Sequence, residues 1–329
     1  MACRVKLADM GTGFFFDEHF RLHDMGEGHP ECGVRLEAIL ERILETGLEH
    51  ALVRPIVHPA TEQDLLLAHS AKHIEYIKAL HEALKLRLLN EPGAFAHIDP
   101  DTWMNANTWD ACLYAVGAVL GATRAVLAGE LTNAFCAVRP PGHHAERDTA
   151  MGFCFFNNVA IAVKYALEFG GLKRVAVVDF DVHHGNGTED ILANDPRTLM
   201  VGFYQHPFYP YKQKIPTPLN MKNIALPAYA KPEQIREMIQ EIWLPELESF
   251  EPEVIFISAG FDAHRDDDMG QFLLRESDYA WITRQIKGVA SRHSNGRIVS
   301  CLEGGYNPRA LALSVESHIR VLADMEHPF

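Results

Sequence analysis

Short apolar runs alternate with stretches of helical periodicity along the second half of the chain. Strands are expected at 134–138, 175–179, 199–203, 254–258 and 298–302. Each run is apolar enough to be covered on both faces of a parallel sheet. Helices are expected at 158–169, 233–250, 277–292 and 309–325. This alternation predicts an α/β fold with a doubly wound, mostly parallel central sheet and helices on both faces.

The first half of the chain shows the same apolar runs and stretches of helical periodicity, but they alternate less regularly. Strands are expected at 13–17 and 52–57, and helices at 34–48, 71–89 and 109–127. Thr61 and Asp64 have the spacing of a helix N-cap. The polar stretch 19–31, which contains His23 and His29, is expected to be a solvated loop. No linker or internal repeat divides the sequence, so we expect a single catalytic domain over residues 1–329.

Composition and charge exclude several classes of function. The 30 basic and 44 acidic residues leave a net charge of -14, which disfavours nucleic-acid binding. Six cysteines without a CxxC pair indicate reduced thiols rather than a disulfide framework or a zinc ribbon. The N-terminal stretch MACRVKLADMGTG has no apolar signal region, and no eighteen apolar residues run together. We therefore expect a cytoplasmic protein that does not span a membrane.

Unusual polar residues directly follow five of the expected strands. The five segments are 139–144, 181–187, 204–210, 259–262 and 303–306. In open α/β sheets, ligands bind outside the carboxyl ends of the strands. We therefore expect these segments to meet at one site.

Two of these segments carry residues suited to binding a metal ion. In RVAVVDFDVHHGNGT (174–188), Asp179, Asp181 and His183 alternate, and they project to one side if the extended conformation persists. Asp181, His183 and Asp262 offer two carboxylates and one imidazole, which leaves room for water and a substrate oxygen, as in catalytic sites. Zinc is the first expectation, and Fe²⁺, Co²⁺ or Mn²⁺ would accept the same ligands.

Other polar residues in the five segments are suited to proton transfer. His143 and His144 follow a Pro-Pro-Gly turn, where one can act as a general base and the other as an acid or electrostatic partner. Asp179 and Asn186 are candidates for orienting the two rings. Tyr306, on a Gly-Gly turn expected to be flexible, can donate a hydrogen bond to an oxyanion. Together these groups indicate metal-assisted hydrolysis of a carbonyl compound, most naturally an amide.

Five motifs resemble those of the histone deacetylase family in residues and in order. They are RPPGHHA (139–145), GFCFFNNVAIA (152–162), DFDVHHGNGT (179–188), SAGFDAH (258–264) and LEGGYN (302–307). The resemblance runs from about Thr12 to Leu322. Asn186, where class I relatives tend to have aspartate, makes the chain similar to the class II and bacterial amidohydrolase-like branch, which is related to acetylpolyamine amidohydrolases.

The resemblance implies an arginase-like α/β fold and a zinc-dependent deacetylase. Its implied metal ligands are Asp181, His183 and Asp262. Its implied catalytic groups are His143 and His144, held by Asp179 and Asn186, together with the carbonyl-polarising Tyr306. The implied acyl-lysine tunnel is formed by Gly152, Phe153, Tyr209, Met269 and Gly304. A potassium ion is implied at the backbone oxygens of Asp179, Asp181, His183, Gly202 and Phe203.

The substrate stays open at this point. The family often continues Phe-Tyr-Pro with Gly-Thr-Gly, whereas this chain has Tyr-Lys-Gln-Lys at 211–214, so the rim of the site differs. Met269 stands where some polyamine-selective relatives carry glutamate, which favours an acyl-lysine peptide or another small N-acyl amide. The acidic run 266–268 keeps an acetylpolyamine open as the alternative substrate.

Two further hypotheses come from different classes of protein, and the oligomeric state is also open. The DAHxD pattern at 262–266 is that of a manganese ureohydrolase, although the stretch 174–188 lacks the aspartates that a second metal needs. A non-catalytic binder of acyl-lysine is the third hypothesis. A monomer and a homo-oligomer are equally compatible with the sequence.

Overall fold

An eight-stranded parallel sheet forms the centre of the computed structural model, which describes residues 11–212 and 217–325. The strand order is β2-β1-β5-β10-β9-β6-β7-β8, and every neighbouring pair is parallel. The strands are β1 (Thr12–Phe15), β2 (Leu52–Val53), β5 (Asn133–Cys136), β6 (Val175–Asp179), β7 (Thr198–Gln205), β8 (Met221–Leu226), β9 (Val254–Ala259) and β10 (Ile298–Leu302). The predicted fold class is confirmed.

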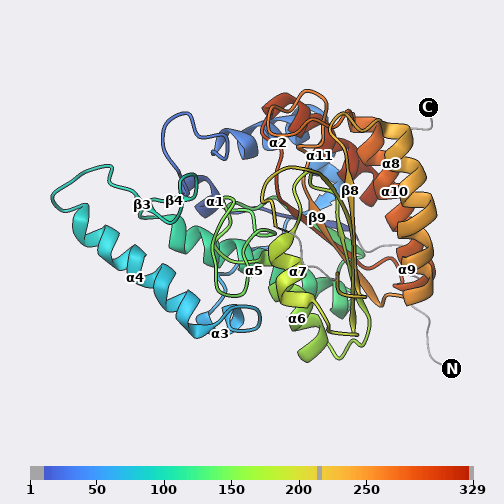
Figure 1. Ribbon diagram of the computed structural model, residues 1–329, viewed down its shortest axis with the longest axis horizontal. Coiled ribbons are helices and arrows are strands. Elements are labelled where there is room, and N and C mark those ends of the chain that lie inside the picture. Colours follow the sequence, from blue (N-terminus) through green and yellow to red (C-terminus); the bar gives the residue numbers. More distant parts are fainter. Residues whose placement is uncertain (1–10, 213–216, 326–329) are drawn as a thin grey trace.

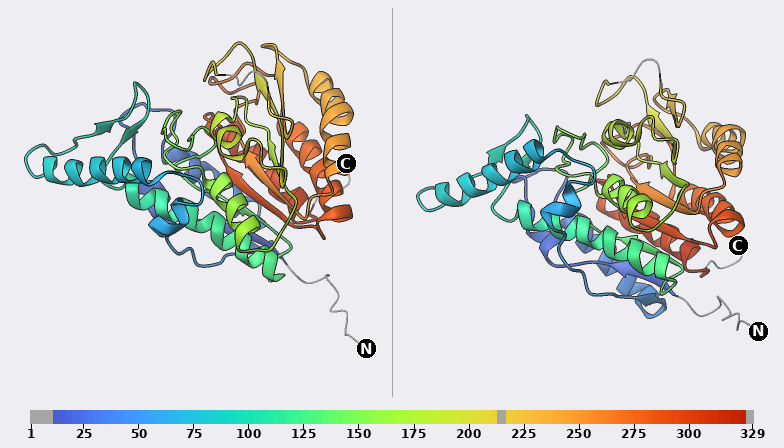
Figure 2. Two further views of the ribbon diagram at one scale, coloured as in Figure 1. Left: turned by 60° about the horizontal axis from the view of Figure 1, so that its bottom comes forward. Right: turned by 90° about the horizontal axis from the view of Figure 1, so that it is seen from below.

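Helices cover both faces of this sheet (Figure 1). They are α1 (His19–Leu22), α2 (Val34–Glu45), α3 (Glu62–Leu65), α4 (Ala71–Arg87), α5 (Thr108–Ala128), α6 (Asn158–Glu168), α7 (Asn186–Leu192), α8 (Pro232–Met238), α9 (Leu244–Phe250), α10 (Glu276–His293) and α11 (Pro308–Leu322). Crossovers between parallel strands are right-handed. The direction in which the chain moves from one strand to the next therefore decides on which face of the sheet the connecting helix lies. Helices α5 to α7 therefore lie on one face, and α2 and α8 to α11 on the other (Figure 2).

Most expected elements occur within a few residues of their predicted bounds, with several differences. Among the elements that the sequence did not indicate are α1, α7 and β8. The expected helix at 233–250 is interrupted by a π-helical turn, Ile239–Trp243, just before Pro245. Proline has no backbone N–H, so the regular hydrogen-bond ladder cannot continue through it. The predicted cap at Thr61 is confirmed as a capping box with Asp64.

The stretch 19–31 is not the solvated loop that its polarity predicted. His23 and Glu31 are fully buried, and the Glu31 carboxylate is bound by two arginines, Arg139 (2.7 Å) and Arg35 (3.0 Å). Although burial alone would raise the pKa of Glu31, the charge of Arg139 holds it well below its ordinary value. Paired charges of this kind can be buried because each compensates the other. They fix the stretch against the end of β5.

Helix α5 is the one helix of the described residues that is long and apolar enough to cross a membrane. In the structure 61% of its most apolar window is buried inside the protein, as in a core helix. Its small residues permit close packing, since a Cβ on Gly117 would lie 1.9 Å from the carbonyl oxygen of His58.

Five cysteines within the described ranges are free thiols. They are Cys32, Cys112, Cys136, Cys154 and Cys301. Cys3 and most of the N-terminal stretch MACRVKLADMGTG lie outside the described residues, as do Gln213 and Lys214 of the altered rim sequence.

A short antiparallel ribbon projects beside the sheet with helix α4 (Figure 1). It consists of β3 (Ala96–His97) and β4 (Trp103–Met104), between helices α4 and α5. Just before β4, the Thr102 hydroxyl accepts a hydrogen bond from the backbone N–H of Phe153 at 3.1 Å. The ribbon is thereby linked to the loop that carries Phe153.

Candidate active site

Three buried side chains converge outside the carboxyl ends of β6 and β9. Ligand atoms of Asp181, His183 and Asp262 all lie within 4.8 Å of one another. Nδ1 of His183 is 3.0 Å from Oδ1 of Asp181 and 3.0 Å from Oδ2 of Asp262. Two carboxylates and an imidazole in this arrangement are a donor set for a divalent transition metal.

The backbone reaches this arrangement by a route that differs from the predicted one. Strand β6 ends at Asp179, so the strict alternation expected through residue 183 is wrong beyond that point. Backbone N–H groups instead wrap around the carboxylates: His183 donates to Asp181 at 2.9 Å and Val182 donates to Asp262 at 2.8 Å. These hydrogen bonds orient both carboxylates before any ion is bound.

Two glycines make room for the carboxylates. A Cβ on Gly304 would lie 2.1 Å from Oδ2 of Asp262, and a Cβ on Gly260 would lie 2.0 Å from Oδ2 of Asp181. The N–H of Gly304 also donates to Asp181 Oδ2 at 2.9 Å. Gly304, expected in the tunnel, thus lies against the metal-ligand cluster. Gly260 was not singled out in the sequence, although it precedes Asp262 in the SAGFDAH motif.

The electrostatics of the cluster favour a cation. Burial and the neighbouring Asp181 carboxylate raise the pKa of Asp262 to about 7. Although burial opposes it, hydrogen bonding to the two carboxylates raises the pKa of His183 to about 10. Two buried carboxylates at one point repel each other unless a positive charge joins them. A divalent ion bound by both carboxylates supplies such a charge.

His143 and His144 lie next to this cluster, with ring centroids 4.1 Å apart. Nδ1 of His143 is 3.2 Å from Oδ2 of Asp179, and Nδ1 of His144 is 2.7 Å from Oδ1 of Asn186. The structure therefore brings each histidine to the orienting partner expected for it.

The two histidines have pKa values that are shifted in opposite directions. Although burial opposes it, the Asp181 and Asp179 carboxylates raise the pKa of His143 to about 10. Burial, followed by the charges of His143 and His183, lowers the pKa of His144 well below its usual range. Adjacent groups with separated pKa values can act as an acid and a base at the same pH.

Glu303 is a site residue that the sequence reasoning passed over. Its fully buried carboxylate accepts hydrogen bonds from the backbone N–H groups of Gly142 (2.7 Å) and His143 (3.1 Å). The Ser258 hydroxyl donates to its other oxygen at 3.2 Å. Glu303 thus fixes the turn that presents the histidine pair. Its position next to Gly304 in the LEGGYN motif was the available signal.

The turn that carries Tyr306 is held in place, contrary to the expected flexibility of Gly-Gly. Arg35 donates to the carbonyl oxygens of Gly305 (2.6 Å) and Glu303 (2.5 Å), and its guanidinium lies 4.9 Å from the centroid of the Tyr306 ring. Asp267 accepts a hydrogen bond from the Tyr306 N–H at 2.6 Å. Burial raises the pKa of the Tyr306 phenol well above its usual value, so the hydroxyl keeps its proton.

Aromatic rings surround the histidines and the tyrosine. Phe208 stacks on His183 at 5.3 Å, Tyr209 meets His144 edge-on at 5.1 Å, and Phe153 meets Tyr306 edge-on at 5.9 Å. A Cβ on Gly152 would lie 2.5 Å from Cδ2 of His144. Gly152, Phe153 and Tyr209 therefore lie where a tunnel to the metal-ligand cluster was expected. Phe208 is an additional ring at this position.

The acidic run 266–268 is divided between the surface and the interior. Asp267 faces inward and accepts from the N–H groups of Met269 (2.9 Å) and Asn307 (3.0 Å), whereas the Asp266 side chain is 57% exposed. Asp267 is therefore not free to attract a polyamine. A second acidic pair, Asp99 and Asp101, lies near Tyr209, and burial together with Asp99 raises the pKa of Asp101 to about 6.

Gly202 lies beside Asp179 in the sheet register, at the position expected to bind potassium. A Cβ on Gly202 would lie 2.7 Å from Oδ1 of Asn223 and 3.2 Å from the carbonyl oxygen of Asp179. Oδ1 of Asn223 is buried and has no hydrogen-bond partner. A buried oxygen without a donor, close to a backbone carbonyl oxygen, suits a hard monovalent cation. Phe203 stacks on Trp243, so its backbone alone could contribute to such a site.

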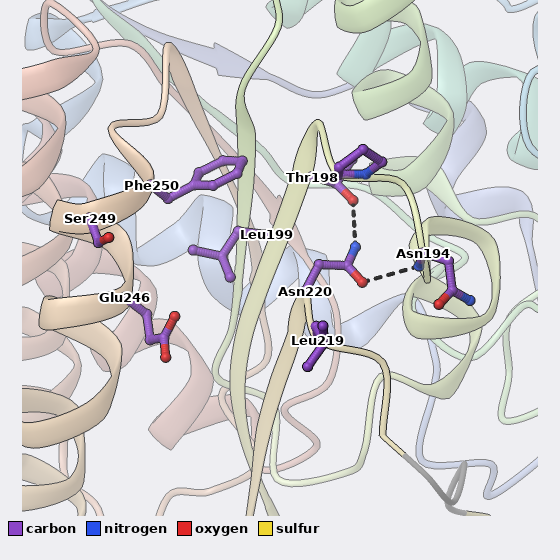
Figure 3. Close-up of a pocket in the computed structure, with 9 residues that line it drawn as sticks. Asn194, Thr198, Leu199, Leu219, Asn220, Glu246, Ser249 and Phe250 are labelled. Carbon is purple, nitrogen blue, oxygen red and sulfur yellow. Dashed lines mark hydrogen bonds between the residues drawn. The ribbon is translucent and has the colours of Figure 1, made fainter.

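A surface cavity of about 470 Å³ lies at the amino ends of β7 and β8, at the opposite end of these strands from the candidate active site (Figure 3). Its lining includes Thr198 and Leu199 at the start of β7, Asn220 before β8, and Glu246 and Phe250 of α9. The metal-ligand cluster lies at the carboxyl ends of the strands, so this cavity is separate from the candidate active site.

Comparisons with known proteins agree with these observations. The family model described as "Histone deacetylase domain" matches residues 29–322. A probable deacetylase of Archaeoglobus fulgidus is 35% identical over 91% of this chain and 82% of its own length. A histone deacetylase-like amidohydrolase of Pseudomonas aeruginosa is 34% identical over 90% of this chain and 82% of its own.

A solved structure is also similar to this chain. The crystal structure of the HDA15 HD domain superposes with a TM-score of 0.88 at 30% identity, over 96% of this chain and 88% of that one. Some curated relatives are much longer, and the chain spans 14% and 49% of two of them.

Proposed function

The chain belongs to the histone deacetylase family, and on this premise we propose that it is a zinc-dependent deacylase of acyl-lysine side chains. The observation that carries the proposal is the buried cluster of Asp181, His183 and Asp262 beside a histidine pair and a tyrosine. Each group has a distinct part in hydrolysing an amide.

A zinc ion would be held by Asp181, His183 and Asp262, whose two oxygens and one nitrogen fit its preferences. When bound, it would polarise the substrate carbonyl and lower the pKa of a water molecule. Fe²⁺ and Co²⁺ accept the same ligands and are alternatives.

The proton-transfer groups of this chain are His143 and His144. His144 is the proposed general base, because Asn186 binds its Nδ1 and leaves Nε2 to accept a proton from the attacking water. His143, paired with Asp179, is the proposed acid that gives a proton to the departing lysine amine. The neutral phenol of Tyr306 donates to the carbonyl oxygen as negative charge develops on it.

Potassium is the proposed second ion, bound by backbone oxygens of Asp179, Asp181, His183, Gly202 and Phe203. The buried, unpartnered Oδ1 of Asn223 beside Gly202 supports this proposal. Such an ion would stabilise the segment between Asp179 and His183, on which two metal ligands depend.

An acyl-lysine peptide or another small N-acyl amide is the proposed substrate, and an acetylpolyamine is the alternative. The absence of a carboxylate at Met269 and the inward position of Asp267 favour the first. The acidic pair Asp99 and Asp101 near Tyr209 is the observation that keeps the second open.

The test is a comparison of kcat/KM on acetyl-lysine peptides, longer acyl-lysines and acetylpolyamines with zinc-loaded protein. Turnover of the peptides is expected, and a large loss of kcat with unchanged metal content is expected for Tyr306→Phe. Absence of turnover on every substrate would overturn the proposal, and tight acetyl-lysine binding without turnover would favour a non-catalytic binder. Two tightly bound transition-metal ions per chain, such as Mn²⁺, would favour a ureohydrolase.

A further inference from the structure

The side-chain amide of Asn186 lies between His144 and a carboxylate to which no function has been assigned. Oδ1 of Asn186 is 2.7 Å from Nδ1 of His144, and its Nδ2 is 2.8 Å from Oε1 of Glu146. The same Nδ2 lies 3.4 Å from the carbonyl oxygen of His144 and 3.5 Å from Sδ of Met151. Each end of the amide therefore has its own set of neighbours.

The neighbours at one end decide which way the amide points. A carboxylate, a carbonyl oxygen and a thioether are all acceptors, so the NH₂ group must face them. The reversed amide would place its oxygen against the negative charge of Glu146. Asn186 must therefore turn its oxygen toward His144, whose Nδ1 must carry a hydrogen to donate. A neutral His144 then has its lone pair on Nε2.

Glu146 is itself held firmly at this position. Its backbone N–H donates to the Thr149 carbonyl oxygen at 2.9 Å, and its own carbonyl oxygen accepts from Nδ1 of His69 at 3.0 Å. The ammonium of Lys212, half exposed at the rim, donates to Oε1 at 2.9 Å. The partly buried Glu146 side chain is thus held in place next to Asn186.

We propose that Glu146 is a positioning residue that sets the tautomer of His144 through the orientation of Asn186. Glu146 does not reach the substrate or the metal ligands in this proposal. The inference rests on the proposed function, in which Nε2 of His144 accepts a proton. Lys212 has a secondary part, since it neutralises Glu146 without contacting Asn186.

Single substitutions measure the strength of this effect. Glu146→Ala removes the acceptor that fixes the amide, and kcat on an acetyl-lysine peptide should fall about 10- to 100-fold with little change in KM. Glu146→Gln can still accept from Asn186 and should restore kcat to within about 3-fold of wild type. Lys212→Met leaves the acceptor in place and should also stay within about 3-fold. Equal losses for the alanine and glutamine variants would contradict the proposal.

Introducing Glu146→Ala into protein that already carries Asn186→Asp distinguishes a positioning role of Glu146 from a general structural role. An aspartate presents an oxygen to His144 in either orientation, so it does not need Glu146 to orient it. Glu146→Ala should therefore cost nothing there, and should raise kcat, because it removes a neighbouring like charge. A loss of the same size in both backgrounds would overturn the proposal. Glu246→Ala is the matched control, since Glu246 lines the separate cavity at the start of β7 (Figure 3) and pairs there with Lys222.

A spectroscopic measurement tests the inference independently of turnover. In zinc-loaded protein with ¹⁵N-labelled histidine, His144 should be protonated at Nδ1 and not at Nε2, and Glu146→Ala should produce a mixture of both tautomers. If the tautomer shifts but wild-type protein hydrolyses no acyl amide, the proposed function fails and the positioning role stands. If wild-type protein is active but the tautomer is the same in both proteins, the positioning role fails.

Discussion

The carboxylate of Asp267 accepts a hydrogen bond from the backbone N–H of Tyr306 at 2.6 Å, which links two loops at the site. The same oxygen accepts from Asn307, and the other oxygen accepts from Met269. One buried side chain therefore fixes the proposed carbonyl-polarising tyrosine and a proposed tunnel residue together.

Replacement of Asp267 by asparagine should loosen the turn that carries Tyr306. The amide NH₂ of asparagine cannot accept a hydrogen bond, so one of the two sets of backbone N–H groups is left unpaired. We expect kcat/KM on acetyl-lysine to fall about 10- to 100-fold. The loss should be smaller on trifluoroacetyl-lysine, whose more electrophilic carbonyl depends less on the Tyr306 hydroxyl. Equal losses on both substrates, or a similar loss for the exposed control Asp266→Asn, would contradict this role.

A methyl group on Gly304 should displace the metal-ligand carboxylates. Its Cβ would lie 2.1 Å from Asp262 and 2.6 Å from Asp181, well inside van der Waals contact. Gly304→Ala should therefore bind zinc at least about 10-fold more weakly in a competition assay with a chelator. Gly288→Ala is the control, because there a Cβ would meet only the end of the Arg292 side chain, at 3.5 Å. Wild-type zinc affinity in the Gly304 variant would show that this packing is not needed.

Potassium should stabilise the protein more than sodium at the same ionic strength. An ion that binds only the folded chain adds about 2.7 kcal/mol when it is present at about 100 times its Kd. Asn223→Leu should reduce the difference between the two salts, because it removes the unpartnered oxygen beside Gly202. Loss of the hydrogen bond from Asn223 to Glu189 affects both salts equally and cancels in this comparison. Identical thermal unfolding of wild-type protein in the two salts would exclude the site.

Stability should fall in acid partly because of His318. This histidine is fully buried between the hydroxyls of Thr283 and Ser300, and burial lowers its pKa from 6.5 to about 3. Between pH 6.5 and 3 the unfolded chain therefore binds a proton that the folded chain does not. His318 alone should therefore lower the free energy of unfolding by about 1.4 kcal/mol per pH unit as the pH falls through this window.

Denaturant unfolding at several pH values checks this slope. His318→Asn should reduce the slope by about that amount, whatever its effect on the stability at neutral pH. His50→Asn, at a side chain that is 86% exposed, is the control and should leave the slope unchanged. A wild-type slope in the His318 variant would show that other groups cause the acid sensitivity.

The sequence determined the sheet and the place of the site. The apolar runs 175–179 and 298–302 were predicted with the bounds that β6 and β10 have, because glycine or polar residues bound both runs. Polar segments after five strands located the site, since the carboxyl ends of parallel strands all lie at the same end of the sheet. Two of the elements that were missed, α7 and β8, had weak local signals: α7 has seven residues, and β8 is an edge strand with a mixed burial pattern.

The tertiary structure decided which polar side chains meet. Glu31 looked solvated because its partner Arg139 is 108 residues away, and nothing local indicates a buried ion pair. Glu303 and Glu146 were passed over, and Asp267 was interpreted only as part of an acidic run, for the same reason, since each accepts hydrogen bonds from groups distant in sequence. Periodicity and motifs report the neighbours of a residue along the chain. The hydrogen bonds that orient the histidines and the tyrosine depend on neighbours in space, which only the folded sheet brings together.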